Sequence, residues 1–469
     1  MTAEEMYLDA MHHNITTEKI FGYVKQLSDP VIAISSGAVI GGWLAEAPYW
    51  FQTTGAGAAF LFPLLALLLV PVGLAFGELS AMLPFAASTD VWTCNAYNNK
   101  AGFATQWMMF LIQVVEPPMM AFIFGTAINH FYPLTNEQMM IIAMLSVTLW
   151  FVLSNFNISL TGRLSNIFFF AMILISLCVS TSFFLSGHWS FDNIRLHQGF
   201  FPKGGYGIFI AMAVFSLKFI GFEMTPTLVE EANFPASKLW KVILSALFIP
   251  ALLYSFVVLA MGGMAPWKEI AAMSMPEPEL IARFGLPSIL AVLAIVSGLM
   301  HAFTTLMGFW TSSARVLYGA SQLNQLPKVF MKVNRYGQPF WANVVVYLFS
   351  LFFCYFSGDN WVQYIYAISS IAAGIVYFIS CLDVVRLRKL HPEWKRPFRA
   401  PGGNFVFGVG MLISIWLIIG ACMELDRGGY VSLGLFFALG AVVYAFAATH
   451  RRVCGYQMRV LTPDDVGKE

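Results

Sequence analysis

Charged residues are scarce in this chain of 469 amino acids. Asp, Glu, Lys and Arg together make up 11% of it, whereas hydrophobic residues make up 58% and aromatic residues 16%. A water-soluble globular protein carries about a quarter charged residues, so the composition excludes that class. With a formal net charge of +1, the chain also lacks the basic surface that binds nucleic acid. The sequence is that of a membrane protein.

Several kinds of functional site are also missing. The six cysteines form no CxxC pair and lie mostly in apolar runs, as small hydrophobic residues do, so we expect neither disulfides nor metal ligands. Only His301 of the eight histidines lies deep in an apolar segment, which leaves no pair of haem ligands. A P-loop for nucleotide-driven pumping is absent. We therefore expect no cofactor, no metal and no enzymatic activity.

Apolar windows bounded by Gly, Pro and charge predict an all-α membrane protein with twelve spanning helices. The first 29 residues contain no apolar core of a cleavable signal peptide, so the first span is expected to direct insertion. A span needs about 20 residues to cross a ~30 Å hydrocarbon core. The spans are expected at 30–52, 57–83, 102–130, 138–157, 164–186, 206–230, 239–262, 287–314, 340–357, 361–383, 404–424 and 430–449.

Lys and Arg residues predict the orientation, because cationic loops stay cytoplasmic. With the N-terminus inside, the inside segments hold 20 of the 26 basic residues when Lys241, at the inner edge of the seventh span, is counted with them, and the outside loops hold 5. Both termini are therefore expected in the cytoplasm, and the protein in the cytoplasmic (inner) membrane. The basic segment from Arg386 to Arg399 is interpreted as a solvated loop that fixes this topology, with lipid headgroup contact as the lesser alternative.

Two spans are interrupted near their middles. The first contains three glycines and two serines within Ser35–Trp43, and the sixth contains Lys218–Pro226 with Gly221 at its centre. Glycine also permits close helix packing, so either segment alone would be unremarkable in a membrane helix. Five spans separate equivalent positions, however, so the two segments cross in opposite directions, as in an inverted repeat with broken helices around a binding site. The free N–H and C=O groups of such breaks attract charged ligands.

Charged residues within the spans strengthen this interpretation, because a charge at the bilayer centre costs at least ~2.5–3.5 kcal/mol. Glu223 is a brace for the helix break or a proton site. Lys218 is an ion-pair partner of Glu46 or Glu116, a contact for an anionic substrate group, or a lysine whose charge changes partners during transport. His301 fits a hydrogen-bonded interior histidine better than a ligand. The candidates for ion or proton coupling are Glu46, Glu116, Lys218, Glu223 and His301.

Two further interpretations concern residues near these breaks. Glu78 lies toward the cytoplasmic end of the second span, where a structural role is the simpler one. Trp43, Phe219 and Phe222 are packing residues or, beside a broken helix, gates and cation–π walls.

In this order, five motifs resemble those of the amino acid, polyamine and organocation (APC) superfamily of secondary transporters. The resemblance extends from about residue 28 to residue 450. The motifs are the glycine-rich Gly37–Gly42, the ELxxxxP-like Glu78–Pro84, the FxGFE-like Phe219–Glu223 followed by Glu230–Pro235, the segment Ser313–Pro327 followed by Asn334–Pro339, and the RPFxxPGG-like Arg396–Gly403.

The resemblance implies a five-plus-five inverted-repeat, LeuT-like fold with discontinuous helices 1 and 6 and two added helices. Residues 1–29 would then be a cytoplasmic segment, 30–383 the transport core with repeats at 30–186 and 206–383, 384–403 a cytoplasmic loop, 404–449 helices 11 and 12, and 450–469 a cytoplasmic tail. By position, the substrate contacts it implies are Ser36, Gly37, Ile40, Gly41, Gly42, Trp43, Gln113, Leu217, Lys218, Phe219, Gly221 and Phe222, with Glu116 as an alternative to Gln113.

Three positions depart from the family pattern. Trp43 stands where a third glycine is common, which narrows the expected carboxylate cradle. Met172 falls where many members have a lysine in the fifth helix, and Lys218 stands where a small or aromatic residue is commoner. We hypothesise that Lys218 replaces the missing lysine.

The expected function is secondary transport of an amino acid or related amine by alternating access. Proton-coupled uptake is the first hypothesis, because buried carboxyls near the midplane can titrate. Exchange of amino acids or polyamines and a non-transporting substrate sensor are the alternatives. The expected partners are the substrate, protons and lipid, without nucleic acid, and the chain is a monomer or a homodimer. An ancillary subunit linked through a cysteine is not expected, because Asn129–Glu137 contains none.

Overall fold

The computed structural model describes residues 41–156, 158–195, 199–227, 229, 235–358 and 360–466. Within these residues the regular structure is helical, and eleven helical segments are long and apolar enough to cross a membrane. The protein is therefore a multi-pass membrane protein. The long helices are α4 (Ala58–Met82), α6 (Asn99–Val114), α7 (Glu116–Phe131), α8 (Asn136–Ser154), α9 (Ile158–Leu185), α11 (Gly204–Val214), α13 (Leu239–Gly262), α16 (Ser288–Gln322), α17 (Phe340–Ser357), α18 (Trp361–Leu390), α19 (Gly403–Glu424) and α20 (Arg427–Cys454).

Shorter elements connect or interrupt these helices. They are α3 (Trp43–Thr54), α5 (Ser88–Ala96), α10 (Phe191–Arg195), α12 (Met224–Thr227), α14 (Trp267–Ala272), α15 (Pro276–Arg283) and the 3-10 turns η1 (Phe215–Phe219), η3 (Ala236–Lys238), η4 (Lys328–Met331) and η5 (Pro463–Asp465). The spans expected at 239–262 and 340–357 coincide with α13 and α17. The first expected span, 30–52, lies partly outside the described residues, and α3 belongs to it.

The third expected span is divided into α6 and α7, which the apolar pattern did not reveal. The two helices meet at Val115, and Glu116, Pro117 and Pro118 open α7. Proline has no N–H to donate to the preceding turn, but it is well tolerated in the first turn of a helix. The double proline therefore restarts the helix in mid-span.

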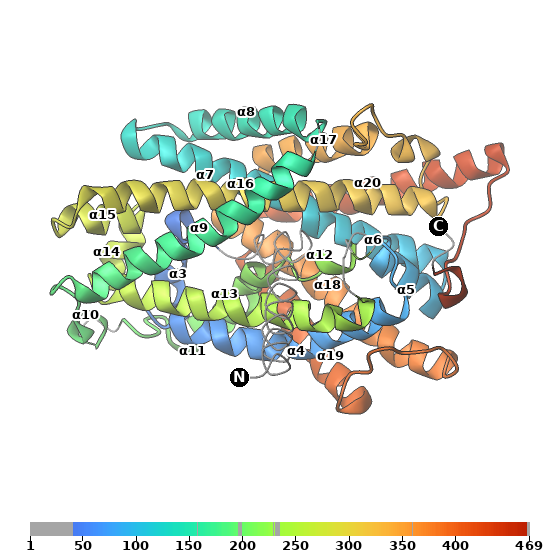
Figure 1. The fold of residues 1–469 in the computed structure, drawn as a ribbon, viewed down its shortest axis with the longest axis horizontal. Coiled ribbons are helices and arrows are strands. Elements are labelled where there is room, and N and C mark those ends of the chain that lie inside the picture. Colours follow the sequence, from blue (N-terminus) through green and yellow to red (C-terminus); the bar gives the residue numbers. More distant parts are fainter. Residues whose placement is uncertain are drawn as a thin grey trace, which may run out of the picture.

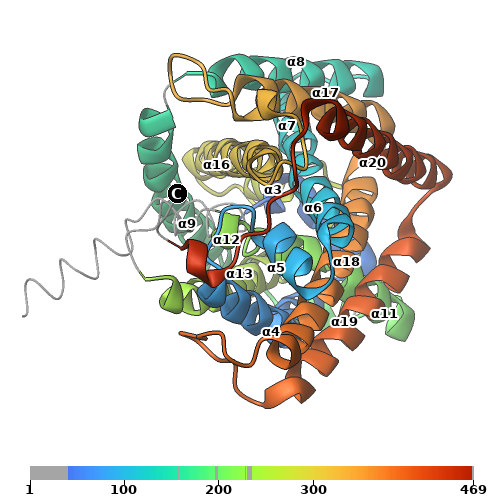
Figure 2. The same cartoon turned by 90° about the vertical axis from the view of Figure 1, so that its right-hand side faces the viewer.

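The most enclosed segments lie at the centre of the bundle. About 94% of the apolar window in Asn99–Phe131 and 89% of that in Gly204–Thr227 is buried, compared with 17% for α8 and 28% for α20. The end-on view shows the same order, with α3, α6, α12 and α18 toward the middle and α8, α9, α17 and α20 around them (Figure 2). In the side view α10, α14 and α15 lie at one end of the bundle and α5 at the other (Figure 1).

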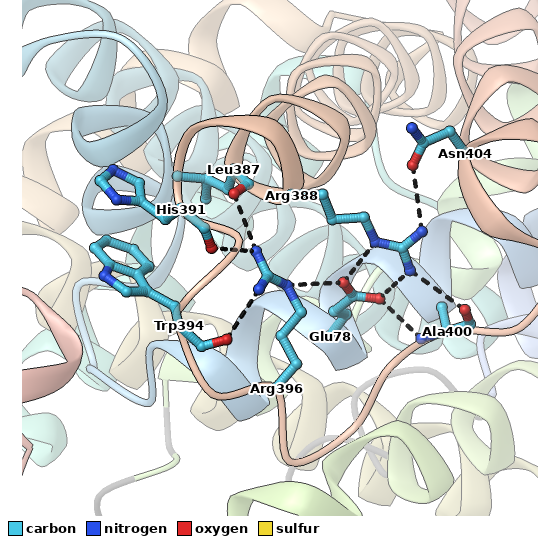
Figure 3. Close-up of polar contacts among 8 residues, drawn as sticks. All are labelled: Glu78, Leu387, Arg388, His391, Trp394, Arg396, Ala400 and Asn404. Atoms are coloured by element: carbon cyan, nitrogen blue, oxygen red, sulfur yellow. Dashed lines mark hydrogen bonds and ion pairs between the residues drawn. The ribbon is translucent and has the colours of Figure 1, made fainter.

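The basic segment that begins at Arg386 is not simply a solvated loop, so that interpretation was wrong for its two central arginines. Arg388 and Arg396 are each only 9% exposed, and both point at the buried carboxylate of Glu78 on α4 (Figure 3). Arg388 donates to both carboxylate oxygens, at 2.8 and 2.6 Å, and the backbone N–H of Ala400 donates at 2.8 Å. Arg396 Nε lies 3.6 Å from Oε1.

These contacts explain two of the sequence motifs together. The Glu of the motif at the end of α4 and the arginine and alanine of the Arg396–Gly403 motif form one cluster, although more than 300 positions separate them. A buried carboxylate needs such partners, because an unpaired one is costly. The structural role expected for Glu78 agrees with this geometry.

Candidate functional site

The described chain enters the bundle through two glycines in left-handed conformations. Gly41 has φ of +125° and Gly42 has φ of +90°, values that L side chains rarely adopt. Gly42 caps α3, and its carbonyl accepts from the backbone N–H of Glu46 at 2.9 Å. Helix α3 starts at Trp43, directly after these glycines, and the part of the expected first span before Gly41 lies outside the described residues. The expected contacts Ser36, Gly37 and Ile40 lie outside the described residues.

The sixth span is interrupted in a similar way. Helix α11 gives way to the 3-10 turn η1, then to non-helical residues around Gly221 (φ +143°), before the short α12 begins. The Glu223 carboxylate accepts from the backbone N–H of Gly221 at 2.9 Å and from the hydroxyl of Tyr377 at 3.2 Å. These are the contacts of a brace for the break, one of the two roles considered for Glu223.

An ion pair joins α3 to the interruption of the sixth span. Lys218 Nζ, on η1, lies 2.9 and 3.2 Å from the carboxylate oxygens of Glu46 on α3, and both side chains are buried. Of the two partners expected for Lys218, the structure selects Glu46. Tyr366 on α18 donates to Glu46 at 2.5 Å and accepts from the indole of Trp50 at 2.8 Å. The Lys218 ammonium lies 5.8 Å from the centre of the Tyr254 ring.

The Lys218–Glu46 pair lies directly against the glycines that precede α3. A methyl group on Gly42 would fall 1.9 Å from Glu46 Oε1 and 2.7 Å from Lys218 Nζ, so only glycine leaves room for these charges. On Gly41 it would fall 2.4 Å from the ring of His301 on α16. His301 Nδ1 lies 3.1 Å from the hydroxyl of Thr305. His301 is therefore an interior histidine packed on the broken backbone.

Glu116 is a second buried carboxyl in this region. It opens α7, and Ser369 on α18 donates to it at 3.1 Å. The charges of Lys218, Glu46 and Glu223 all act on this carboxyl group. Gln113, one turn earlier, is fully buried, and its Oε1 has no hydrogen-bond donor among the described residues.

The aromatic candidates and Leu217 are packed within the bundle. Phe222 stacks on Tyr377 with ring centres 5.3 Å apart, and Phe219 lies 6.4 Å from Phe62. Leu217 is buried, and its carbonyl accepts from Ile220 N at 2.9 Å. These contacts fit the packing interpretation better than a gate.

Trp43 links the centre to the short helices at one end of the molecule. Its ring meets Tyr254 edge-on at 5.9 Å, and its side chain hydrogen-bonds the carboxyl of Glu277 on α15. Burial raises the pKa of Glu277 to about 8, and the bond from Trp43 offsets a part of that rise.

Helix α18 supplies contacts that were missed in the sequence. Tyr366, Ser369 and Tyr377 reach Glu46, Glu116 and Glu223 in turn. Their spacing of three and then eight residues places them along one helical stripe. In the sequence, this stripe of polar residues in an otherwise apolar span was the signal that could have identified these contacts.

Comparisons with known proteins agree over most of the chain. A family model described as amino acid permease matches residues 30–448. The chain is 23% identical to the gamma-aminobutyric acid permease of Bacillus subtilis over 76% of this chain and 78% of that protein. It is 24% identical to the branched-chain amino acid permease of Lactococcus lactis over 96% and 97%. It is also 24% identical to the D-serine/D-alanine/glycine transporter of Escherichia coli over 66% and 67%.

Proposed function

Because the chain belongs to the amino acid permease family, we propose that it is a secondary transporter that takes up a zwitterionic amino acid by alternating access. The observation that supports this most is the Lys218–Glu46 pair, which lies between α3 and the 3-10 turn η1 and packs against Gly42. Its charges mirror those of an amino acid. In this proposal the substrate carboxylate replaces Glu46 as the partner of Lys218, and the substrate ammonium replaces Lys218 as the partner of Glu46.

The energetics of a buried pair favour this class of ligand. A ligand that breaks the pair but binds just one of its members leaves the other charge buried and unpaired, at a cost of ~3–5 kcal/mol. A ligand with both charges keeps Lys218 and Glu46 satisfied together, whereas a simple amine or a simple acid does not. The substrates in the printed names of the three relatives each combine an amino group with a carboxyl group.

The excess of carboxyl groups supports proton coupling. Three buried carboxyl groups, those of Glu46, Glu116 and Glu223, lie in this region, and among the described residues the ammonium paired with one of them is that of Lys218, which holds Glu46. If all three carboxyls were ionised, two negative charges would stay uncompensated in a buried space, which is strongly unfavourable. The cluster therefore favours the uptake of protons together with the substrate.

Net uptake also fits the closed ion pair better than obligatory exchange does. Lys218 and Glu46 lie 2.9 Å apart and neutralise each other. The unloaded carrier can thus neutralise its own site before it changes conformation, and it needs no second substrate for the return step.

The basic residues support an orientation for this cycle. Arg388, Arg396 and Arg451 lie at the end of the bundle that carries α5, to which we assign the cytoplasmic side of the inner membrane. The opposite end, with α10, α14 and α15, then faces outward, and substrate enters there.

Uptake into proteoliposomes tests the proposal. Purified protein is reconstituted, and labelled L-valine, D-serine and γ-aminobutyrate are offered with and without an inward proton gradient. We expect accumulation of at least one compound, reduced when the gradient is collapsed. Uptake only into vesicles preloaded with amino acid would indicate exchange, and stabilisation by a ligand without flux would indicate a sensor; either result would contradict the proposal.

A further inference from the structure

A cavity lies between the Lys218–Glu46 pair and the end of the bundle that we assign to the outside. It has a volume of about 230 Å³ and is enclosed by the C-terminal ends of α3 and α19 and the N-terminal ends of α11 and α18. At roughly 30 Å³ for each water molecule in the liquid, this is room for several waters or one small solute. The side chains that matter most are Tyr49, Gln52, Lys203, Gln363 and Glu424.

The lining of this cavity is polar and carries both signs of charge. Lys203 precedes α11, and Glu424 ends α19, yet no ion pair joins them or involves Lys203 elsewhere in the described ranges. At Glu78, where a charge pair stabilises the fold, a guanidinium nitrogen of Arg388 lies 2.6 Å from the carboxylate. Lys203 and Glu424 instead both line the cavity without forming an ion pair with each other.

Glu424 is fixed in place rather than loose. Its Oε2 accepts from Gln363 at 3.1 Å and from the Tyr49 hydroxyl at 3.4 Å, while Gln363 also donates to its backbone carbonyl at 3.0 Å. No donor for Oε1 is found among the described residues. The carboxylate therefore keeps one oxygen available toward the cavity.

The opposite wall suits an anion. Helix α11 begins at Gly204 beside Lys203, and Lys203 offers no side-chain cap to it. The N–H of Gly204 donates to the carbonyl of Phe201 at 2.8 Å, but the next N–H groups at a helix start lack partners within the helix and attract negative charge. The Lys203 ammonium and this helix start therefore act on the same carboxylate-sized group.

One residue connects the cavity to the centre. The Tyr49 ring meets Tyr366 at 5.3 Å, and Tyr366 donates to Glu46. Glu46, Tyr49 and Thr53 occupy positions i, i+3 and i+7 of α3, so they follow one face from the ion pair to the cavity. Other cavities, such as one lined by Phe330, Val345, Phe352 and Val442, are apolar and suit an acyl chain better than a zwitterion.

From this geometry we propose that the cavity is an outer binding site for a zwitterionic amino acid, whose carboxylate meets Lys203 and whose ammonium meets Glu424. This inference rests on the proposed transport function. It adds a site where substrate binds before it reaches the Lys218–Glu46 pair, with Tyr49 and Tyr366 between the two sites.

Equilibrium binding of labelled L-valine, D-serine and γ-aminobutyrate to purified protein tests the inference. We expect wild type to bind two molecules of a transported probe per chain. The near-isosteric variants Lys203→Met and Glu424→Gln should each bind one, and at low concentration their uptake should be about 10- to 100-fold slower, the loss expected for a contact to a charged group. Lys268→Met and Asp192→Asn, exposed changes at the same end of the molecule, are the matched controls and should retain both sites.

The outcomes separate the inference from the function on which it rests. Retention of two bound molecules and of wild-type uptake by folded Lys203→Met or Glu424→Gln would overturn the outer site and leave the transport proposal standing. Binding of one molecule by wild type, lost in Lys218→Ala and unchanged in the two cavity variants, would do the same. Absence of both binding and uptake of every probe in wild type would overturn both. Because the two variants change separate helices, a folding defect in one leaves the other as a test.

Discussion

Two buried carboxylates in this protein are paired with cations in different ways. Glu78 accepts from two positions of the Arg388 guanidinium and from the backbone N–H of Ala400, with Arg396 close by. Glu46 has a single lysine and one tyrosine hydroxyl. Arginine is always protonated and binds a carboxylate through a fixed fork, whereas lysine is a point charge on a flexible stem and can lose its proton when buried.

The difference separates a permanent contact from an exchangeable one. No small solute can replace the fork and the backbone donor that hold Glu78, and the arginines cannot be neutralised. The partners of Glu46 are an ammonium and a hydroxyl, which the ammonium of an amino acid can substitute. We infer that Glu78 locks the loop that follows α18 onto α4 and that Glu46 exchanges partners during transport.

The largest effect is expected from breaking the permanent contact. Glu78→Ala leaves two buried guanidinium groups without their carboxylate, which should cost ~3–5 kcal/mol of stability. Size-exclusion chromatography of detergent-solubilised protein should show little folded material. Glu393→Ala is the matched control, because this carboxylate of the same loop is 63% exposed. A Glu78→Ala protein as stable as wild type would contradict the assigned role.

Breaking the exchangeable contact should affect transport rather than folding. In Lys218→Ala, Glu46 retains its bond from Tyr366, so the chain should still fold. Uptake into proteoliposomes should fall at least about 100-fold, as expected when one partner of a buried charge pair at a binding site is truncated. Uptake at the wild-type rate would remove Lys218 from the mechanism.

A smaller effect is expected from moving the central pair without removing it. Gly42→Ala places a methyl group 1.9 Å from Glu46 Oε1 in a backbone with φ of +90°, so the carboxylate must shift. A displacement of this size should slow uptake about 10- to 100-fold. Gly434→Ala in α20, where an added methyl group meets nothing within 4 Å, should transport normally. Equal behaviour of the two variants would contradict the assigned geometry.

Glu277 on α15 extends the comparison to a carboxyl without a cation, for none pairs with it in the described ranges. Burial raises its pKa from 4.5 to about 8, so the buried form prefers the proton. Docking of α15 should be strongest below the ordinary pKa of 4.5 and weaken as the pH rises through about 8.

Hydrogen exchange of the amides in α15 measures this pH dependence. Protection, corrected for intrinsic exchange, should fall several-fold between about pH 6 and about pH 9, and the fall should disappear in Glu277→Gln. An equal fall in the variant would mean that another group is responsible.

The sequence predicted helices more reliably than contacts between them. Apolar runs with clear ends predicted α13 and α17 to the residue, because hydrophobicity decides which segments enter a bilayer. The break before Pro117 was missed, since the segment is apolar on both sides. Lys218 had two possible partners, and only the fold selects Glu46. The partners of Glu78 could not be predicted, because they depend on how a loop folds back more than 300 positions later.

Neutralising both members of the central pair tests most directly whether it is the place where substrate binds. Lys218→Met/Glu46→Gln removes both charges and keeps side chains of similar size, so no unpaired charge is left buried. We expect this double variant to melt close to wild type, to bind one molecule fewer per chain of L-valine, D-serine or γ-aminobutyrate than wild type does, and to show no uptake of them. Accumulation of any of the three at the wild-type rate by the double variant would contradict the account.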